Sequence, residues 1–187
     1  MRAVLCSRNE HKRRELERVL PGWTVELLDA DDYPPETGDT FLANARGKAL
    51  YGREVGPADA WMLGEDSGLE VEALGGRPGV ETARWAEGRH VERILEALAG
   101  EADRRARYVC ELVALAPDGR ELRGTGTLEG SIADEPRGAA GFGFDPVFVP
   151  DGEEQTVAEL GDTWKSEHSH RARAAAALRA QLDQANC

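Results

Sequence analysis

The chain has 187 residues, of which 41% are apolar and 31% are charged, and acidic residues exceed basic ones by 35 − 23 = 12. This length and composition are typical of a soluble globular protein with one domain, residues 1–187, or one domain with two lobes. The acidic balance argues against a nucleic-acid partner, which requires a basic surface, and no apolar stretch is long enough to span a membrane or to form a signal peptide.

The hydrophobic pattern predicts strands that alternate with helices in the first half of the chain. In chain order we expect a strand at 2–6, a helix at 9–20, a strand at 23–28, a helix at 41–53, strands at 60–63 and 69–74, and a helix at 90–99. In the second half we expect strands at 107–116 and 120–132, a segment rich in Gly and Phe at 138–150, and a closing helix at 169–184 that Ser169 would cap.

Two features of this order indicate the fold class. The sequence Pro117-Asp118-Gly119 between two expected strands is a hairpin signal. Early alternation of strands with helices and a late hairpin together predict an α/β protein with a mixed β-sheet.

The three cysteines, Cys6, Cys110 and Cys187, are far apart and have neither zinc-site spacing nor the pattern of a disulfide framework. Cys6 and Cys110 lie in apolar, strand-like runs, where a reduced thiol packs as a small apolar side chain. We therefore expect a reducing, cytoplasmic location.

The segment 64–69, Gly-Glu-Asp-Ser-Gly-Leu, is the most informative part of the chain. It places Glu65 and Asp66 at the exit of the expected strand 60–63, before a predicted Ser-Gly turn. Open α/β sheets bind ligands and metals at strand exits, and burying two adjacent acids is costly unless a cation or a proton-transfer role balances them. The alternative is a solvated acidic turn.

A second candidate segment follows the first strand. The free N–H groups at a helix start attract anions, and Ser7, Asn9 and Lys12 add hydrogen-bond donors and charge there. These residues could hold phosphate groups. The alternative is ordinary capping of the helix by Ser7 or Asn9, beside a surface lysine.

Around the second helix, Asn44 and Lys48 are four residues apart and share a helix face. Glu36 lies in the loop before that helix. It could join Asp66 as an oxygen ligand of Mg²⁺, which takes few protein carboxylates and keeps several waters. The alternative is a solvated acid in an acidic loop.

Two late segments carry aromatic residues and donors. In 141–146, Gly143 and its neighbours leave the Phe142 ring open to a flat ligand, and Asp145 can accept hydrogen bonds from a base or sugar. The alternative is a buried aromatic turn. In the segment 165–171, several hydrogen-bond donors could surround an electron-rich edge of a ligand. His168 and His170 could be read as a metal site, but no third ligand has matching spacing.

Together these segments resemble the inosine triphosphate pyrophosphatase family nearly end to end. The resemblance rests on the order of its motifs: Ser-x-Asn-x-x-Lys-x-x-Glu-Leu at 7–16, Glu-Thr-Gly-x-Thr-Phe at 36–41 with Asn-Ala at 44–45 and Lys-Ala at 48–49, Asp-Ser-Gly-Leu at 66–69, Leu-Gly-Gly-x-Pro-Gly at 74–79, Ala-Arg at 83–84, Gly-Phe-Gly-Phe-Asp-Pro at 141–146, Lys at 165 and Ser-His-Arg at 169–171. Each motif alone is weak, but their combined order and spacing are specific.

The resemblance implies hydrolysis of the α–β phosphoanhydride of ITP, dITP and XTP. It implies Mg²⁺, with Mn²⁺ as a substitute, a homodimer, and an elongated, two-lobed α/β fold whose long mixed sheet is flanked by helices. By position, Asp66 would be the general base and, with Glu36, a metal ligand. The substrate-binding residues would be Ser7, Asn9, Lys12, Lys48 and Ser67 at the phosphates, and Phe142, Gly143, Phe144, Asp145, Lys165, His170 and Arg171 at the nucleoside.

The chain departs from this family at several positions. Glu65 replaces an Asp, and Glu81-Thr82 replaces Tyr-Ser. Ala43 replaces a Glu that would complete a capping box if Thr40 is the N-cap, or that would instead support the metal, in which case its loss would lower activity. The segment near His90 is short, which bears on dimerisation. One alternative is therefore a nucleotide-binding protein of the same fold with reduced hydrolysis. A sister pyrophosphatase family with a Ser-Pro-Arg-Arg signature and a purely structural α/β domain fit the motifs less well.

Overall fold

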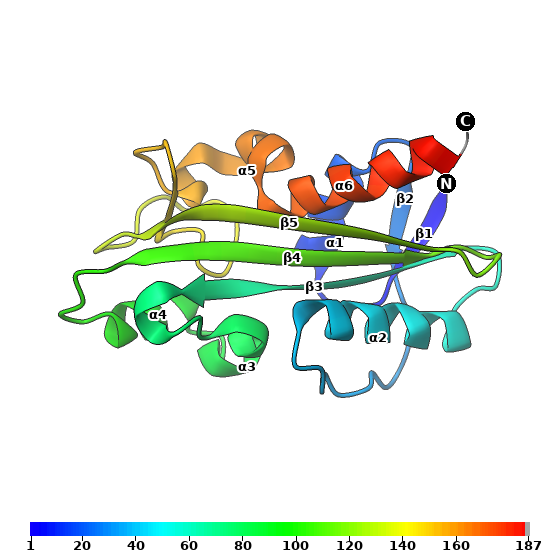
Figure 1. Ribbon diagram of the computed structural model, residues 1–187, viewed down its shortest axis with the longest axis horizontal. Helices are drawn as coiled ribbons and strands as arrows, with labels where there is room; N and C mark the ends of the chain where they lie inside the picture. The colour runs from blue at the N-terminus through cyan, green and yellow to red at the C-terminus, as the bar shows by residue number, and fades with distance from the viewer. Residues whose placement is uncertain (186–187) are drawn as a thin grey trace. The chain divides into compact units, whose positions relative to one another are not determined.

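Six strands form one sheet in a computed structural model that describes residues 1–185 (Figure 1). The strands are β1 (Arg2–Leu5), β2 (Thr24–Leu27), β3 (Trp61–Val71), β4 (Arg105–Leu115), β5 (Glu121–Ile132) and β6 (Phe148–Pro150). The α-helices are α1 (Glu10–Val19), α2 (Phe41–Val55), α3 (Thr82–Ala86), α4 (His90–Ala97), α5 (Val157–His168) and α6 (His170–Ala185). None of the helices within residues 1–185 has the length and apolar character that crossing a membrane requires.

The sheet is mixed, in the order β2-β1-β3-β4-β5-β6. β1 pairs in parallel with both β2 and β3, whereas β5 and β6 are antiparallel. The predicted turn between β4 and β5 is present: the Ala116 N–H donates to the Arg120 carbonyl at 2.8 Å, and Gly119 takes a positive φ of 88°. The expected α/β class with a mixed sheet is confirmed.

The chain divides into two compact units, and the three long strands contribute residues to both. Unit 1 comprises Met1–Asp66, Cys110–Gly126 and the chain from His170, and unit 2 comprises Ser67–Val109 and Thr127–Ser169. The expectation of one domain over residues 1–187 stays a prediction.

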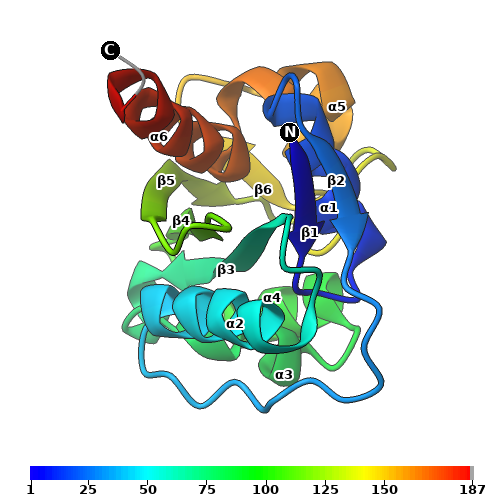
Figure 2. The same cartoon turned by 90° about the vertical axis from the view of Figure 1, so that its right-hand side faces the viewer.

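In unit 1 the sheet has helices on both faces. Figure 2 shows α2 on one face, and α1 and α6 on the other. The apolar core follows this layering, because successive strand residues point to opposite faces. Leu63 of β3 packs with Leu16 of α1 and Leu178 of α6, while its neighbour Met62 packs with Ala45 and Ala49 of α2. Cys6 and Cys110 are buried, free thiols in these cores, as the sequence predicted.

In unit 2 the core lies between strand residues and short helices. Ile94 and Leu98, in and just after α4, pack with Leu69, Tyr108 and Leu128 of the strands and with Phe144, Phe148 and Val157.

The sequence prediction missed α3, α5 and β6. Helix α5 begins with a capping box, in which Thr156 accepts from the Glu159 N–H and Glu159 accepts from the Thr156 N–H, and it is kinked at Gly161.

The predicted turn after Asp66 is wrong. The strand continues through Ser67 and Gly68, so that β3 replaces the two expected strands at 60–63 and 69–74. Polar residues inside the segment suggested a break, but residues of other elements satisfy both carboxylates within the strand, as described below. Side chains therefore alternate between faces without interruption from Trp61 to Val71.

Gly64 allows β3 and α2 to approach closely. A Cβ atom at this position would lie 1.9 Å from the Ala45 carbonyl oxygen and 2.6 Å from the Ala49 nitrogen. Both are backbone atoms of α2, so no side-chain rotation would relieve the clash. This close approach brings the face of α2 that carries Asn44 and Lys48 against the strand that carries Asp66.

We predict that Gly64→Ala lowers the free energy of unfolding by about 1–3 kcal/mol, the usual cost of overpacking a core, because helix and strand must separate. Chemical denaturation measures the change. Gly47→Ala is the matched control: a Cβ atom at this position of α2 meets no atom within 4 Å, and alanine favours a helix over glycine by up to about 1 kcal/mol. Equal stabilities of the Gly64→Ala and wild-type proteins would contradict the close-contact argument.

Candidate functional site

Glu65 and Asp66 are buried neighbours in β3 whose side chains point to opposite faces of the strand. The exposed fractions are 1% for Glu65 and 5% for Asp66. Glu65 meets residues of α1 and α6, whereas Asp66 meets residues of α2. The two acids therefore form two separate sites, rather than one shared pair of carboxylates.

Asp66 is held by two side chains of α2. Lys48 Nζ donates to Asp66 Oδ1 at 2.9 Å, and Asn44 Nδ2 donates to Asp66 Oδ2 at 3.1 Å. Lys48 also pairs with Glu36 Oε1 at 2.7 Å. The carboxylates of Asp66 and Glu36 thus converge on one cationic group, and the sequence-predicted trio of Glu36, Lys48 and Asp66 is brought together in unit 1.

The start of α2 fixes this arrangement. Thr40 is the N-cap, and its hydroxyl accepts a hydrogen bond from the Ala43 N–H at 3.1 Å. Ala43 therefore stands at the third helical position, where a glutamate would have completed a capping box. The Asn44 side-chain oxygen accepts from the Gly38 N–H at 2.8 Å, which ties the loop that carries Glu36 to the helix.

Glu65 is held by cations from two other helices. Lys12 Nζ lies 2.6 Å from Glu65 Oε2, and Arg171 donates to Glu65 Oε1 from Nη2 at 2.9 Å and from Nε at 3.2 Å. Arg171, itself 1% exposed, also pairs with Glu15. The Cys110 thiol lies 3.4 Å from Glu65 Oε1.

These surroundings move the pKa values of the two acids in opposite directions. Burial raises the pKa of Asp66, and the charges of Lys48 and Lys12 only partly offset this increase. Burial also acts to raise the pKa of Glu65, but Lys12 and Arg171 outweigh it and hold that pKa well below its usual value. The opposite shifts make Asp66 the more basic of the two carboxylates.

Ser7 and Asn9 take part in the start of α1. The Asn9 side-chain oxygen accepts from the backbone N–H groups of His11 and Lys12 at 3.0 and 3.2 Å, and Ser7 Oγ accepts from the Asn9 N–H at 3.0 Å. This is the capping role that the sequence left open. A phosphate-binding role for Ser7 and Asn9 stays a prediction.

In unit 2, Asp145 is the centre of a second buried cluster. Its Oδ2 accepts from Lys165 Nζ at 2.7 Å and from the Phe142 N–H at 2.9 Å, and its Oδ1 accepts from the Tyr108 hydroxyl at 3.2 Å. Lys165 Nζ lies 5.0 Å from the centre of the Phe142 ring. Loop 141–146 and α5 are thus joined through one ion pair whose side chains are 4% and 5% exposed.

The two phenylalanines of this loop differ in burial. Phe144 is 2% exposed and contacts the His90 ring edge-on at 5.0 Å, so it is a core residue, whereas Phe142 and Gly143 are only partly buried. Phe142 is therefore not a core residue. Of the other predicted residues, Ser67 follows Asp66 in β3, and His170 is buried at the start of α6.

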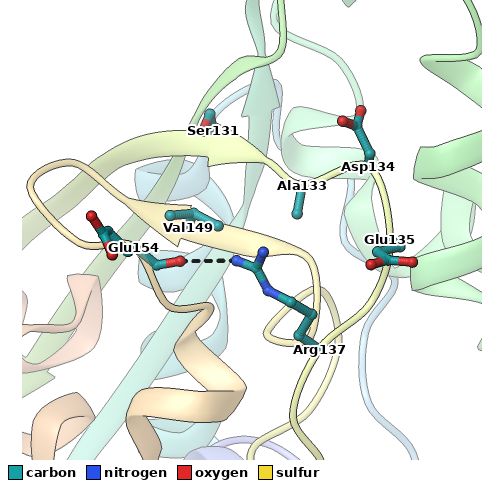
Figure 3. Close-up of a pocket in the computed structure, with 7 residues that line it drawn as sticks. All are labelled: Ser131, Ala133, Asp134, Glu135, Arg137, Val149 and Glu154. Atoms are coloured by element: carbon teal, nitrogen blue, oxygen red, sulfur yellow. Dashed lines mark hydrogen bonds between the residues drawn. The ribbon is translucent and has the colours of Figure 1, made fainter.

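A surface pocket of about 420 Å³ in unit 2 contains none of the predicted site residues. It is lined by Ser131, Ala133, Asp134, Glu135, Arg137, Val149 and Glu154 (Figure 3). Arg137 extends across it and donates to the Glu154 carbonyl at 3.0 Å. Within residues 1–185, no group of three or more His, Cys, Asp or Glu side chains is arranged to hold a metal.

Sequence reasoning missed two partners of the predicted residues. Tyr108 has no local motif, and only the tertiary fold brings its hydroxyl to Asp145. Glu15 belongs to the motif at 7–16 and follows Lys12 by three residues on the same helix face, which was the available signal.

Comparisons with known proteins find similar chains and one similar fold. The family model of the Ham1 family matches residues 3–181. A dITP/XTP pyrophosphatase of Gloeobacter violaceus is 46% identical over 176 residues, which cover 91% of this chain and 89% of that protein. A dITP/XTP pyrophosphatase of Symbiobacterium thermophilum is 44% identical over 184 residues, which cover 94% of this chain and 91% of that protein. The solved structure of the Staphylococcus aureus Ham1 protein is similar with a TM-score of 0.84 and 34% identity, over 99% of this chain and all of that chain.

We predict that Lys48→Gln raises the pKa of Asp66 further, because the Lys48 charge favours the ionised carboxylate. Carbon-detected NMR titration of the Asp66 carboxyl group measures this change. Arg46→Gln is the matched control: Arg46 lies on the same helix but pairs with Glu121 at 2.9 Å, so the pKa of Asp66 should not move. An unchanged or lowered pKa in Lys48→Gln would contradict the assigned ion pair.

Proposed function

The chain belongs to the Ham1 family, and we propose that it is a nucleoside triphosphate pyrophosphatase that hydrolyses dITP, ITP and XTP to the monophosphate and pyrophosphate. Such an enzyme removes non-standard purine nucleotides from the nucleotide pool. The observation that carries the proposal is Asp66, a buried carboxylate with a raised pKa that Asn44 and Lys48 hold in place.

The proposed reaction breaks the α–β phosphoanhydride. A water oxygen forms a bond to the α-phosphorus while the bond to the bridging oxygen breaks, so pyrophosphate leaves and the monophosphate remains. Asp66 accepts the proton of the attacking water. A general base is most effective when its pKa is near the working pH, and the raised pKa of Asp66 is a shift in that direction.

Glu36 and Asp66 would hold Mg²⁺, for which Mn²⁺ could substitute. The two carboxylates fit such an ion because both already converge on the Lys48 ammonium group, and Mg²⁺ takes few protein carboxylates. When bound, the ion supplies positive charge that lowers the repulsion between a polyanionic substrate and its nucleophile. That charge matters in a chain with a net charge of −12.

The remaining proposed roles concern the phosphates. Lys12 and Lys48 supply positive charge, and their side chains are 16% and 15% exposed. Ser7, Asn9 and Ser67 are proposed to donate hydrogen bonds to phosphate oxygens. Arg171 was expected to bind the purine. Its pairing with Glu65 and Glu15 also favours a supporting role, because Glu65 pairs with Lys12 as well.

The residues of unit 2 are proposed to recognise the base. Phe142 offers a partly exposed ring for stacking, and Asp145 keeps Lys165 fixed beside that ring. Lysine is a donor-only side chain, which suits the 6-oxo acceptor of hypoxanthine and xanthine. Gly143 and Phe144 lie in the same loop and are proposed to shape this region. A base-reading role for His170, which lies at the start of α6 in unit 1, stays a prediction.

The alternative of a binding protein without hydrolysis was motivated by Ala43 and Glu65. Thr40 caps α2 although residue 43 is not a glutamate. Ala43 therefore removes only the second hydrogen bond of a capping box, the one that a glutamate side chain would accept from the Thr40 N–H. Glu65 retains the negative charge and two cationic partners. Both observations favour the hydrolase. A homodimer is proposed on the family resemblance alone, and a cytoplasmic location is proposed from the free, buried thiols of Cys6 and Cys110.

We predict that wild-type protein with Mg²⁺ releases pyrophosphate from dITP and XTP, and that kcat/KM for dITP exceeds that for dATP by up to roughly 10⁴-fold, because a donor that faces the 6-amino group is left unpaired. Phosphorus NMR identifies pyrophosphate as the product, and EDTA should abolish its release. Lys165→Met should lower the ratio of kcat/KM for dITP to kcat/KM for dATP.

That ratio is measured on one protein sample, so it does not depend on the folded fraction. Arg137→Met is the control, because Arg137 is a surface cation of unit 2 that pairs with Glu159 and should leave the ratio unchanged. Equal kcat/KM values for dITP and dATP in the wild-type protein would overturn the proposed base selectivity. Full activity in excess EDTA would overturn the metal proposal.

We also predict that Asp66→Asn lowers kcat for dITP by roughly 10²–10⁴-fold with a smaller change in KM, since the amide has a similar shape but cannot accept the proton. Steady-state kinetics measure both constants. Glu70→Gln in the same strand is the control, because Glu70 pairs with Arg107 at 2.7 Å on a partly exposed surface. A kcat within a few-fold of the wild-type value in Asp66→Asn would remove Asp66 from the role of base.

A further inference from the structure

Glu65 is a fully buried acid that connects three elements of unit 1. Its side chain is 0% exposed, and it pairs with Lys12 of α1 and Arg171 of α6. The two cations approach different carboxylate oxygens, Lys12 at Oε2 and Arg171 at Oε1. Each oxygen therefore has its own cationic partner.

The free energy of folding does not readily explain this cluster. Removing ions from water is costly, and a buried ion pair is often no more stabilising than apolar side chains of similar volume. Leu63 and Leu112 form an apolar core on the same face of the sheet, so an apolar residue at position 65 would have had partners. The charge at position 65 therefore points to a role other than packing.

Residue 65 contacts two lysines of unit 1, Lys12 and Lys48, of which Lys48 also pairs with the proposed base. Its carboxylate holds Lys12, and its backbone carbonyl accepts a hydrogen bond from Lys48 Nζ at 3.0 Å. A side-chain substitution alters only the first contact, since the carbonyl remains. Lys12 has 16% of its side chain exposed, so it contacts a fully buried carboxylate and is still partly accessible to solvent.

We propose that Glu65 is a positioning residue, which holds the Lys12 ammonium group at a fixed place in unit 1 through one carboxylate oxygen while Arg171 pairs with the other. This inference rests on the proposed function. Glu15 supplies Arg171 with a second carboxylate, so that the four charges sum to zero. Glu65 acts through Lys12 and does not touch the reacting atoms.

The first test is Glu65→Gln, which keeps the shape and removes the charge. We expect kcat for dITP to fall at least tenfold. KM should change less, because the loss of the anchor and the removal of a negative charge near a polyanionic substrate have opposite effects on binding. Glu65→Asp keeps the charge on a side chain one methylene shorter, so it should lose less kcat than Glu65→Gln.

The second test asks whether Glu65 acts through Lys12. In a Lys12→Met background, adding Glu65→Gln should lower kcat by less than twofold, because the anchored group is already absent. The same comparison with Glu65→Asp carries the test if Glu65→Gln does not fold. Multiplicative losses of kcat in the double variant would overturn the proposal.

Glu15→Gln is the matched control, because it removes the other carboxylate that pairs with Arg171 and leaves Lys12 with its partner. It should lower the melting temperature while kcat stays within about twofold of the wild-type value. A Glu65→Gln protein with a lowered melting temperature and an unchanged kcat would show a structural role only and overturn the inference. Absence of dITP hydrolysis in the wild-type protein would instead overturn the proposed function.

Discussion

The arrangement of unit 1 depends on a single constraint: two adjacent acids lie in the middle of a buried strand. A carboxylate removed from water requires a cation or hydrogen-bond donors, and successive strand residues face opposite ways. Glu65 and Asp66 therefore need partners on both faces of the sheet. Lys12 and Arg171 pair with Glu65 on one face. Asn44 and Lys48 contact Asp66 on the other face.

Unit 2 satisfies a buried acid in a similar way, but from a loop. Asp145 receives hydrogen bonds from Lys165, Tyr108 and the Phe142 backbone, which come from a helix, a strand and the loop itself. In both units a carboxylate fixes the position of a lysine that would otherwise be flexible. The acids thus organise the cations, and the cations are the groups best suited to an anionic or electron-rich substrate.

Much of the local structure could be predicted from the sequence, because it depends on neighbours in the chain. Apolar periodicity placed the early strands and helices, the Pro-Asp-Gly turn placed the hairpin, and Thr40 could be recognised as an N-cap. The prediction failed at residues 67–68, where a Ser-Gly pair signalled a turn. Local pattern could not reveal that β3 continues, because the groups that satisfy its two acids come from distant segments.

The sequence by itself determined the family resemblance, the α/β class and the residue types of the candidate site, since these are properties of order and spacing along the chain. Only the tertiary structure decided which cation pairs with which acid. Glu65 and Arg171 are 106 residues apart in the chain, and Tyr108 and Asp145 are 37 apart, so no local period relates them. The physical reason is that a buried charge pairs with whichever opposite charge the fold brings close to it. The order of residues along the chain does not show which charge that is.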